Sequence, residues 1–214
     1  MKLKLENAKN IAVIGAGFIG VEFSDELKKR GFNVTLVEKE PHILCQAFDQ
    51  ELSLKIQEIL VSCNINVVTG TGIKEVIGES KVEAIELENG QKLPMDAVIL
   101  SMGYRPNNEL AKKSSINLDE SGFIPVDEYM KTDLADIFAV GDCAQKRDFV
   151  TRRRTPTMLA STACAEARVA GMNLFNLNVV KTFSGTIAIY STALGNAGFG
   201  TAGITEQRAN QEGI

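Results

Sequence analysis

Three glycines near the start of the chain, Gly15, Gly17 and Gly20, have the spacing of a phosphate-binding loop. They follow an apolar run typical of a buried strand and open a segment with helical periodicity. In such a setting the first glycine permits a tight turn, the second lets a pyrophosphate approach the backbone, and the third allows close packing of helix and strand. The helix N-terminus would add free N–H groups and partial positive charge. The motif therefore predicts a dinucleotide site, with a glycine turn kept only for packing as the alternative.

A carboxylate, Glu38, ends the next predicted strand and lies 18 residues after Gly20. At this place a carboxylate can accept hydrogen bonds from a ribose 2′-OH. A 2′-phosphate would meet like charge there, at a cost of up to about 4 kcal/mol at an effective dielectric of 20. No arginine lies between Val37 and Gln50, although Lys39 is adjacent. The pattern therefore favours NAD(H) over NADP(H), and a solvated acid at a strand end is the alternative.

A second candidate segment lies far along the chain, at residues 136–144, with the sequence DIFAVGDCA. It indicates a buried strand that ends in Gly-Asp, where an open α/β sheet presents ligand-binding groups. Together with GAGFIGVE at 15–22 and SMGYRPN at 101–107, it resembles the FAD-dependent pyridine nucleotide–disulfide oxidoreductases. The most similar branch holds NADH oxidases, NADH peroxidases and coenzyme A-disulfide or persulfide reductases. The resemblance runs through essentially the whole chain, with the motifs in the family's order.

The resemblance implies an NADH side of the site. The glycine segment would bind the NADH pyrophosphate, and Phe18 would cover the flavin until the nicotinamide displaces it. Glu22 would be a catalytic residue beside the nicotinamide, often paired with a lysine from elsewhere. Core packing of Phe18 and a plain surface role for Glu22 are the alternatives. The implied NAD(H)-binding residues are Gly15, Gly17, Phe18, Ile19, Gly20, Glu38 and Gly103.

The resemblance also implies an FAD side. Asp142 would accept a hydrogen bond from the ribityl chain of FAD, and a turn residue at a strand end is the alternative. A predicted helix would point its N-terminus at the pyrimidine edge of the flavin. Reduced flavin carries negative charge at that edge, so a helix N-terminus would stabilise it. The implied residues at this helix start are Leu159, Ala160, Ser161 and Thr162.

The sequence departs from the family in two respects. It has one glycine fingerprint, the NAD one, whereas the family begins with an FAD-binding half that carries its own fingerprint and the redox cysteine. None of the four cysteines has the context of that redox cysteine, and Cys143 is expected only to pack. With no CxxC pair and a single histidine, neither a metal site nor a disulfide is predicted. Buried or half-buried thiols in a reducing cytosol are expected at Cys45, Cys63, Cys143 and Cys164.

Hydrophobic periodicity predicts the elements that position these residues. The N-terminal part of the chain has the pattern of a strand, a helix and a second strand within 30 residues, so the two strands should be parallel. Asp49 can cap the following helix, and Asn89-Gly90 fits the tight turn of an antiparallel meander. The predicted strands are 10–14, 33–38, 65–68, 72–77, 81–88, 91–94, 97–101, 123–126 and 137–140, with two more beyond 181, and the predicted helices are 18–30, 50–62, 159–174 and one from about 205.

These elements predict an α/β protein in three segments. Residues 1–117 are expected to form a Rossmann-like, three-layer NAD(H)-binding domain with an antiparallel meander. Residues 118–180 would be the C-terminal half of an FAD domain, and 181–214 the start of an α+β interface domain. The implied parent enzyme passes a hydride from NADH to FAD, and then electrons to oxygen, peroxide or a disulfide or persulfide. The full-length parent is expected to be a homodimer.

For the chain by itself we expect NAD(H) binding without NADH oxidase turnover. The alternative is a non-catalytic dinucleotide-binding subunit or fragment that pairs with a separate FAD-bearing partner. An NAD-dependent dehydrogenase without flavin is disfavoured, because the only histidine, His42, lies in a loop of the NAD domain. The basic run Arg152–Arg154 is expected to be a solvated loop, with binding of a phosphate-rich substrate such as coenzyme A as the alternative.

Composition agrees with a globular chain of this kind. The 214 residues are 44% hydrophobic and carry 23 basic and 27 acidic side chains, for a net charge of −4. This balance disfavours nucleic acid or an anionic membrane as the main partner. Neither a membrane span nor a signal peptide is recognisable, so a cytoplasmic location is predicted.

Overall fold

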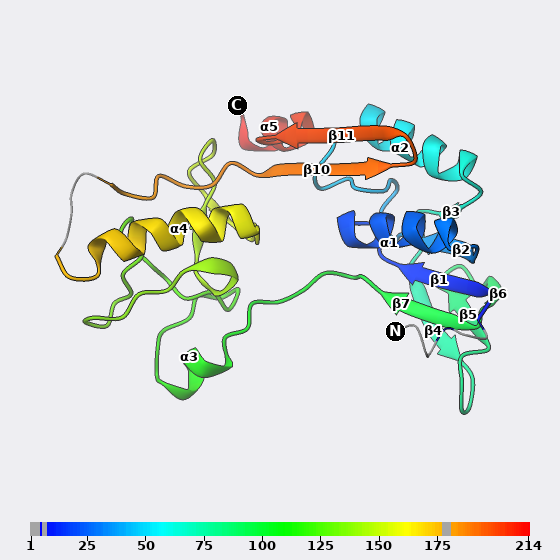
Figure 1. Cartoon of the computed structure of the whole chain (residues 1–214), viewed down its shortest axis with the longest axis horizontal. Helices are drawn as coiled ribbons and strands as arrows, with labels where there is room; N and C mark the ends of the chain where they lie inside the picture. The colour runs from blue at the N-terminus through cyan, green and yellow to red at the C-terminus, as the bar shows by residue number, and fades with distance from the viewer. Residues whose placement is uncertain (1–4, 6–7, 177–180) are drawn as a thin grey trace. The chain divides into compact units, whose positions relative to one another are not determined.

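The computed structural model describes residue 5, residues 8–176 and residues 181–214 (Figure 1). By its internal contacts the chain divides into two compact units. Unit 1 comprises Met1–Gly103, Tyr190–Thr201 and Thr205–Ile214, and unit 2 comprises Tyr104–Ile189 and Ala202–Ile204. The assignment of three segments to NAD, FAD and interface domains stays a prediction.

A parallel sheet is the centre of unit 1. It has the order β3-β2-β1-β7, formed by Asn66–Val68, Asn33–Val37, Asn10–Ile14 and Ala97–Leu100. Strand β1 pairs in parallel with both β2 and β7, with Ile14 opposite Val37 and Leu100. The carboxyl ends of these strands therefore meet at one edge, which is where open α/β sheets bind ligands.

Alternate residues of β1 serve opposite faces of the sheet, as the pleat requires. Ile11 and Val13 pack in the cluster beneath α1 (Phe18–Lys29) and α2 (Gln50–Ser62). Ala12 and Ile14 pack in the other cluster, with side chains of the meander. Figure 1 shows the helices on one side of the sheet and the meander on the other. The meander strands are β4 (Ile73–Ile77), β5 (Ala84–Leu87) and β6 (Lys92–Pro94), antiparallel in that order.

The last segment of unit 1 is a hairpin followed by a short helix. Strands β10 (Ile189–Leu194) and β11 (Ala197–Ala202) form a two-stranded sheet, and Leu194 is completely buried in the helix-side cluster. Helix α5 (Glu206–Glu212) is capped by Thr205, whose hydroxyl accepts a hydrogen bond from the Arg208 N–H.

Unit 2 consists of short elements around one longer helix. Helix α3 (Glu109–Lys113), the 3₁₀ turn η2 (Gly141–Cys143) and the strand pair β8 (Lys146–Arg147) and β9 (Arg154–Thr155) precede α4 (Ala160–Asn173). Helix α4 packs against η2. One face of α4 is buried, and the residues on it are Thr162, Glu166, Val169, Ala170 and Asn173.

The predicted fold class, α/β with a three-layer first domain, is confirmed, and most element bounds of unit 1 agree within one or two residues. Two predicted strands of unit 2, 123–126 and 137–140, are wrong. Their residues make only the isolated bridges Ile124–Ala144 and Lys131–Phe138. The second segment is bounded by two residues with left-handed backbone, Asp136 (φ 64°) and Gly141 (φ 81°), which interrupt an extended ladder.

Two smaller expectations are also corrected. Asp49 occupies the N-cap position of α2 without capping it, because its carboxylate accepts the Glu206 N–H at 2.8 Å. Cys164 is exposed, because it lies away from the buried face of α4, while Cys45, Cys63 and Cys143 are half-buried and all four are free thiols.

Candidate functional site

The glycine loop leaves the carboxyl end of β1 at the centre of the sheet edge. The Gly15 N–H donates to the Val37 carbonyl at 2.8 Å, which ties the loop to β2. Gly15 has φ +96°, a conformation that favours glycine, and a Cβ there would lie 2.6 Å from the Ser101 carbonyl oxygen. The loop conformation therefore depends on the first glycine.

The other two glycines differ in their surroundings. A Cβ on Gly20 would lie 1.9 Å from the Gly15 carbonyl oxygen, so the third glycine is required by contact within the loop itself. A Cβ on Gly17 would have no protein atom within 4 Å. Gly17 is also exposed and stands at the N-terminus of α1, so the space over it is open to a ligand. This is the geometry that the sequence analysis expects for a pyrophosphate.

Ser101, at the end of β7, is a loop-positioning residue that the sequence analysis missed. Its hydroxyl lies 2.8 Å from the Ile14 carbonyl oxygen and 2.7 Å from the Gly15 carbonyl oxygen. A signal was present, because Ser101 begins the SMGYRPN segment, but only the parallel pairing of β1 with β7 brings it to the loop. Gly103 follows with φ +88° and open space where a Cβ would stand.

Glu38 lies against the glycine loop, as the fingerprint predicts. Its carboxylate accepts the Ala16 N–H at 2.5 Å and the Glu40 N–H at 2.9 Å. The side chain is half-buried, and Lys39 beside it pairs instead with Glu88 at 3.7 Å. The carboxylate is thus held in place before any ligand arrives, at the sheet edge next to Gly17.

Phe18 and Glu22 lie in the first two turns of α1. The Phe18 ring stacks on the Tyr190 ring, with centroids 5.0 Å apart, and lies 5.7 Å from the Phe48 ring. Glu22 is exposed, and its carboxylate accepts the hydroxyl of Thr192 in β10 at 2.9 Å. Thr192 is a further residue that the sequence analysis missed, since it is 170 positions away.

The predicted flavin-side residues lie in unit 2. Asp142 is exposed in η2, beside α4. Helix α4 has Leu159 at its N-cap without a side-chain cap, and Ser161 in its first turn is exposed. Thr162 is buried instead, and its hydroxyl lies 2.7 Å from the hydroxyl of Thr186. The structure thus gives two groups of candidate residues, one in each unit.

Behind Asp142 lies a buried ion pair that the sequence analysis also missed. The side chains of Lys146 and Glu166 are fully buried, with Nζ 3.5 Å from Oε1. Glu166 Oε2 accepts the Gly141 N–H at 2.7 Å. Burial raises the pKa of Glu166, and the nearby Asp142 raises it further, while the Gly141 N–H and the Lys146 ammonium lower it.

The direction of this pKa shift predicts a pH dependence of stability. A carboxyl group with a raised folded-state pKa contributes stability below its ordinary pKa and loses that contribution as the pH rises through the raised value. We therefore expect the wild-type chain to lose free energy of unfolding, relative to Glu166→Gln, as the pH rises above the ordinary carboxyl pKa of about 4. Urea unfolding of both proteins over a series of pH values measures the difference, and a constant difference would contradict the assignment.

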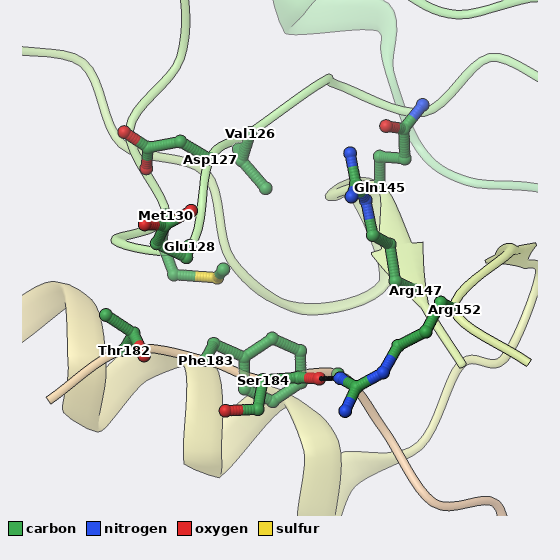
Figure 2. A pocket seen from close by; sticks show the side chains of 11 residues that line it. Val126, Asp127, Glu128, Met130, Gln145, Arg147, Arg152, Thr182, Phe183 and Ser184 are labelled. Atoms are coloured by element: carbon green, nitrogen blue, oxygen red, sulfur yellow. Dashed lines mark hydrogen bonds between the residues drawn. The ribbon is translucent and has the colours of Figure 1, made fainter. Parts of the chain in front are cut away.

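Unit 2 also contains a hollow of about 460 Å³. Figure 2 shows Arg147 and Arg152 on one side of it and Asp127 and Glu128 across from them. The Arg152 guanidinium donates to the Ser184 carbonyl at 2.8 Å and lies 4.6 Å from the Phe149 ring centre. All three arginines of the run Arg152–Arg154 are exposed, in agreement with a solvated basic loop.

Among the residues that the structure describes, no group of three or more His, Cys, Asp or Glu side chains could hold a metal ion. In that same part of the chain, no helix has both the length and the apolar character needed to cross a bilayer.

The fold and the loop geometry define the class, a Rossmann-like α/β protein with a dinucleotide fingerprint. Comparison with known proteins gives the family. Residues 1–167 match the model of the pyridine nucleotide-disulphide oxidoreductases. The chain belongs to this family, and the predicted resemblance is confirmed.

Two curated relatives illustrate the similarity. An NADH oxidase of Methanocaldococcus jannaschii is 34% identical over 206 residues, which cover 96% of this chain and 45% of the relative. An NAD(P)H coenzyme A polysulfide/persulfide reductase of Pyrococcus horikoshii is 31% identical, with 99% of this chain and 46% of the relative covered. The chain therefore spans just under half the length of these two relatives.

Solved structures agree with this assignment. An NAD-dependent persulfide reductase from A. fulgidus superposes with a TM-score of 0.93 at 31% identity, covering all of this chain and 39% of the other. A water-forming NADH oxidase from Lactobacillus brevis, bound to NADH, gives a TM-score of 0.91 at 27% identity, again over all of this chain and 46% of the other.

Proposed function

We propose that this chain is the NADH-binding portion of a flavoprotein oxidoreductase that passes a hydride from NADH to FAD. The electrons then go to oxygen, peroxide or a disulfide or persulfide. The observation that carries the proposal is the open space over Gly17 at the N-terminus of α1, with the Glu38 carboxylate fixed beside the same loop. The relatives named NADH oxidase and persulfide reductase support the same reaction class.

The NADH side rests on groups of unit 1. The N–H groups at the start of α1 are available to pyrophosphate oxygens, and the helix dipole favours negative charge there. Glu38, already oriented by two backbone N–H groups, would accept from a ribose hydroxyl. Glu22, oriented by the Thr192 hydroxyl, would lie beside the nicotinamide as the catalytic residue. Ile19, exposed at the same helix start, would contact the dinucleotide.

The charge and the exposure of residues in unit 2 support FAD binding there. The exposed Asp142 carboxylate can accept from ribityl hydroxyls, and the uncapped start of α4 offers N–H groups to a negatively charged ring edge. Leu159, Ala160, Ser161 and Thr162 would supply that edge of the site. Bound FAD would supply the two-electron chemistry of the reaction.

Absorbance spectroscopy tests the flavin side. The chain is incubated with FAD and desalted, and its visible spectrum is recorded before and after addition of NADH. A retained flavin band that NADH bleaches supports the proposal. We expect no steady NADH consumption by the chain with no added partner. Steady turnover under those conditions would contradict this part of the proposal.

A second candidate is a non-catalytic subunit that pairs with a separate FAD-bearing partner in the cytoplasm. The dinucleotide loop at Gly15–Gly20 would serve such a subunit equally well. Co-purification with a flavin-bearing protein would support this candidate. A monodisperse chain that holds FAD and turns over NADH without a partner would exclude it. A homodimer of the full-length parent is the corresponding expectation for the first candidate.

The Glu38 carboxylate is expected to set the preference for NADH over NADPH. Glu38→Gln removes the negative charge that a 2′-phosphate would meet, while an amide oxygen remains to accept the Ala16 N–H. We expect the NADH-to-NADPH affinity ratio to fall by about tenfold, which is about 1.4 kcal/mol of the repulsion of up to about 4 kcal/mol. Calorimetric titration with both nucleotides measures the ratio.

Glu40→Gln is the matched control, because it removes the same charge from an exposed neighbour in the same loop. Its affinity ratio should stay near that of the wild-type chain. An equal fall in both variants would show that net charge, and not the position of Glu38, determines the preference.

A further inference from the structure

The buried side chains of Lys146 and Glu166 hydrogen-bond to the backbone of the turn that carries Asp142 and of the residue after it. Glu166 comes from the second turn of α4, and Lys146 from the start of β8. The exposed fractions of these residues are 2% for Lys146 and 0% for Glu166. Removing two charges from water is costly unless hydrogen bonds compensate for it. The hydrogen bonds that offset this cost therefore identify the part of the backbone that the pair keeps in place.

These contacts hold Gly141 on both sides. Its N–H donates to Glu166 Oε2 at 2.7 Å, and its carbonyl accepts from Lys146 Nζ at 2.5 Å. The Lys146 ammonium also donates to the Ala144 carbonyl at 3.0 Å, and the Ala144 N–H returns to the Gly141 carbonyl at 3.0 Å. The backbone on both sides of Asp142 is thus fixed by one carboxylate and one ammonium.

The conformation of Gly141 needs such support. Its φ is +81°, and a Cβ there would meet only Ala163 at 3.7 Å, so steric contacts with neighbouring residues do not enforce this conformation. A glycine can adopt many other backbone conformations at little cost in free energy. Glu166 Oε1 has no hydrogen bond of its own and lies 3.5 Å from Lys146 Nζ. The pair is therefore the main constraint on the turn from the side of the core.

We infer that Lys146 and Glu166 are positioning residues that hold the Gly141–Cys143 turn so that the Asp142 carboxylate is presented in one orientation. The inference rests on the proposed function for the role of that orientation, which is to accept from a polyhydroxyl chain such as the ribityl group of FAD. Neither side chain contacts the ligand. They act through the backbone of the turn, and a change in either one alters how well Asp142 is placed.

Two variants and one control test the inference in the full 214-residue chain. Glu166→Ala removes the acceptor of the Gly141 N–H, and Glu166→Gln keeps an acceptor oxygen but removes its charge. Val169→Ala is the matched control, because Val169 is a buried residue of the same helix that packs with Met130 and Ala170 and makes no hydrogen bond to the turn. This variant should destabilise unit 2 while the hydrogen bond from the Gly141 N–H to the Glu166 carboxylate stays intact.

The first readout needs no cofactor. Amide NMR of the labelled chain should show the Gly141 proton at low field in the wild-type protein, because its hydrogen bond to a carboxylate is short. We expect an upfield shift in both Glu166 variants, and hydrogen exchange of this amide at least about tenfold faster in Glu166→Ala. If Glu166→Ala does not fold, the shift in Glu166→Gln decides. Gly141 and Asp142 signals that change no more than in Val169→Ala would overturn the inference.

The second readout is FAD retention after desalting, measured well below the unfolding temperature of each variant. We expect at least about tenfold weaker retention in Glu166→Ala, an intermediate loss in Glu166→Gln, and wild-type retention in Val169→Ala. Equal retention in all four proteins would overturn the link to ligand binding. A wild-type chain that retains no FAD would count against the proposed function, while the NMR result would still decide whether the pair holds the turn.

Discussion

Gly17→Ala is expected to weaken NADH binding by about 100-fold, which is about 2.7 kcal/mol. The added methyl group would occupy the space over the loop where the pyrophosphate must approach the backbone. The fold should be unaffected, because no protein atom lies within 4 Å of the new Cβ. The free energy of unfolding should therefore change by no more than about 1 kcal/mol. Calorimetric titration and urea unfolding measure the two effects.

Gly171→Ala is the matched control for this prediction. Gly171 lies within α4, and a Cβ there would also have open space around it. The change should slightly stabilise the helix, by up to about 1 kcal/mol, and leave NADH affinity as it was. If Gly17→Ala bound NADH as tightly as Gly171→Ala, the dinucleotide would not lie over this loop.

Lys146→Met is expected to have the largest effect on stability. It leaves the Glu166 carboxylate buried without a counter-ion and takes a donor from the carbonyls of Gly141 and Ala144. Breaking a buried pair in this way costs about 3–5 kcal/mol. The double variant Lys146→Met, Glu166→Leu should recover much of the loss, because both charges are then absent. Urea unfolding of the wild type and the two variants measures these differences.

An ion pair at the surface supplies the control. Lys74 Nζ lies 2.5 Å from Glu86 Oε1 on the meander, and the Lys74 side chain is 60% exposed while that of Glu86 is 12% exposed. Lys74→Met should change stability far less, because the exposed Lys92 ammonium, 3.2 Å from Glu86 Oε2, still neutralises this carboxylate and solvent screens both lysines. A loss from Lys146→Met that is no greater than the loss from Lys74→Met would mean that the buried pair is not a structural constraint.

Local pattern was sufficient to predict the first unit. Strand β1, helix α1 and helix α2 were predicted within one residue at each end, because each has clear periodicity, and glycines bound β1 and α1. Local patterns could not predict the contacts between segments that are far apart in the sequence. Ser101 reaches the Gly15 carbonyl across 86 positions, and Thr192 reaches Glu22 across 170. Only the assembled sheet and hairpin bring these pairs together.

In the second unit the sequence was less informative. Segments 123–126 and 137–140 have strand composition, but their backbone groups are mostly bonded to turns, as where the Ala139 N–H donates to the Met130 carbonyl. Lys146 and Glu166 were not predicted to be buried, because an isolated lysine or glutamate in a sequence is most often exposed. Their burial follows from the contact of α4 with η2, which no local pattern reveals.

The central claim is that NADH binds at the Gly15–Gly20 loop with Glu38 beside it. Amide NMR of the labelled chain during an NADH titration tests this claim most directly. We expect saturable shifts in the amides of Gly15 to Gly20 and in those of Glu38 to Glu40, with smaller changes elsewhere in unit 1. Shifts that are absent at millimolar NADH, or that saturate only at residues outside this sheet edge, would contradict the account.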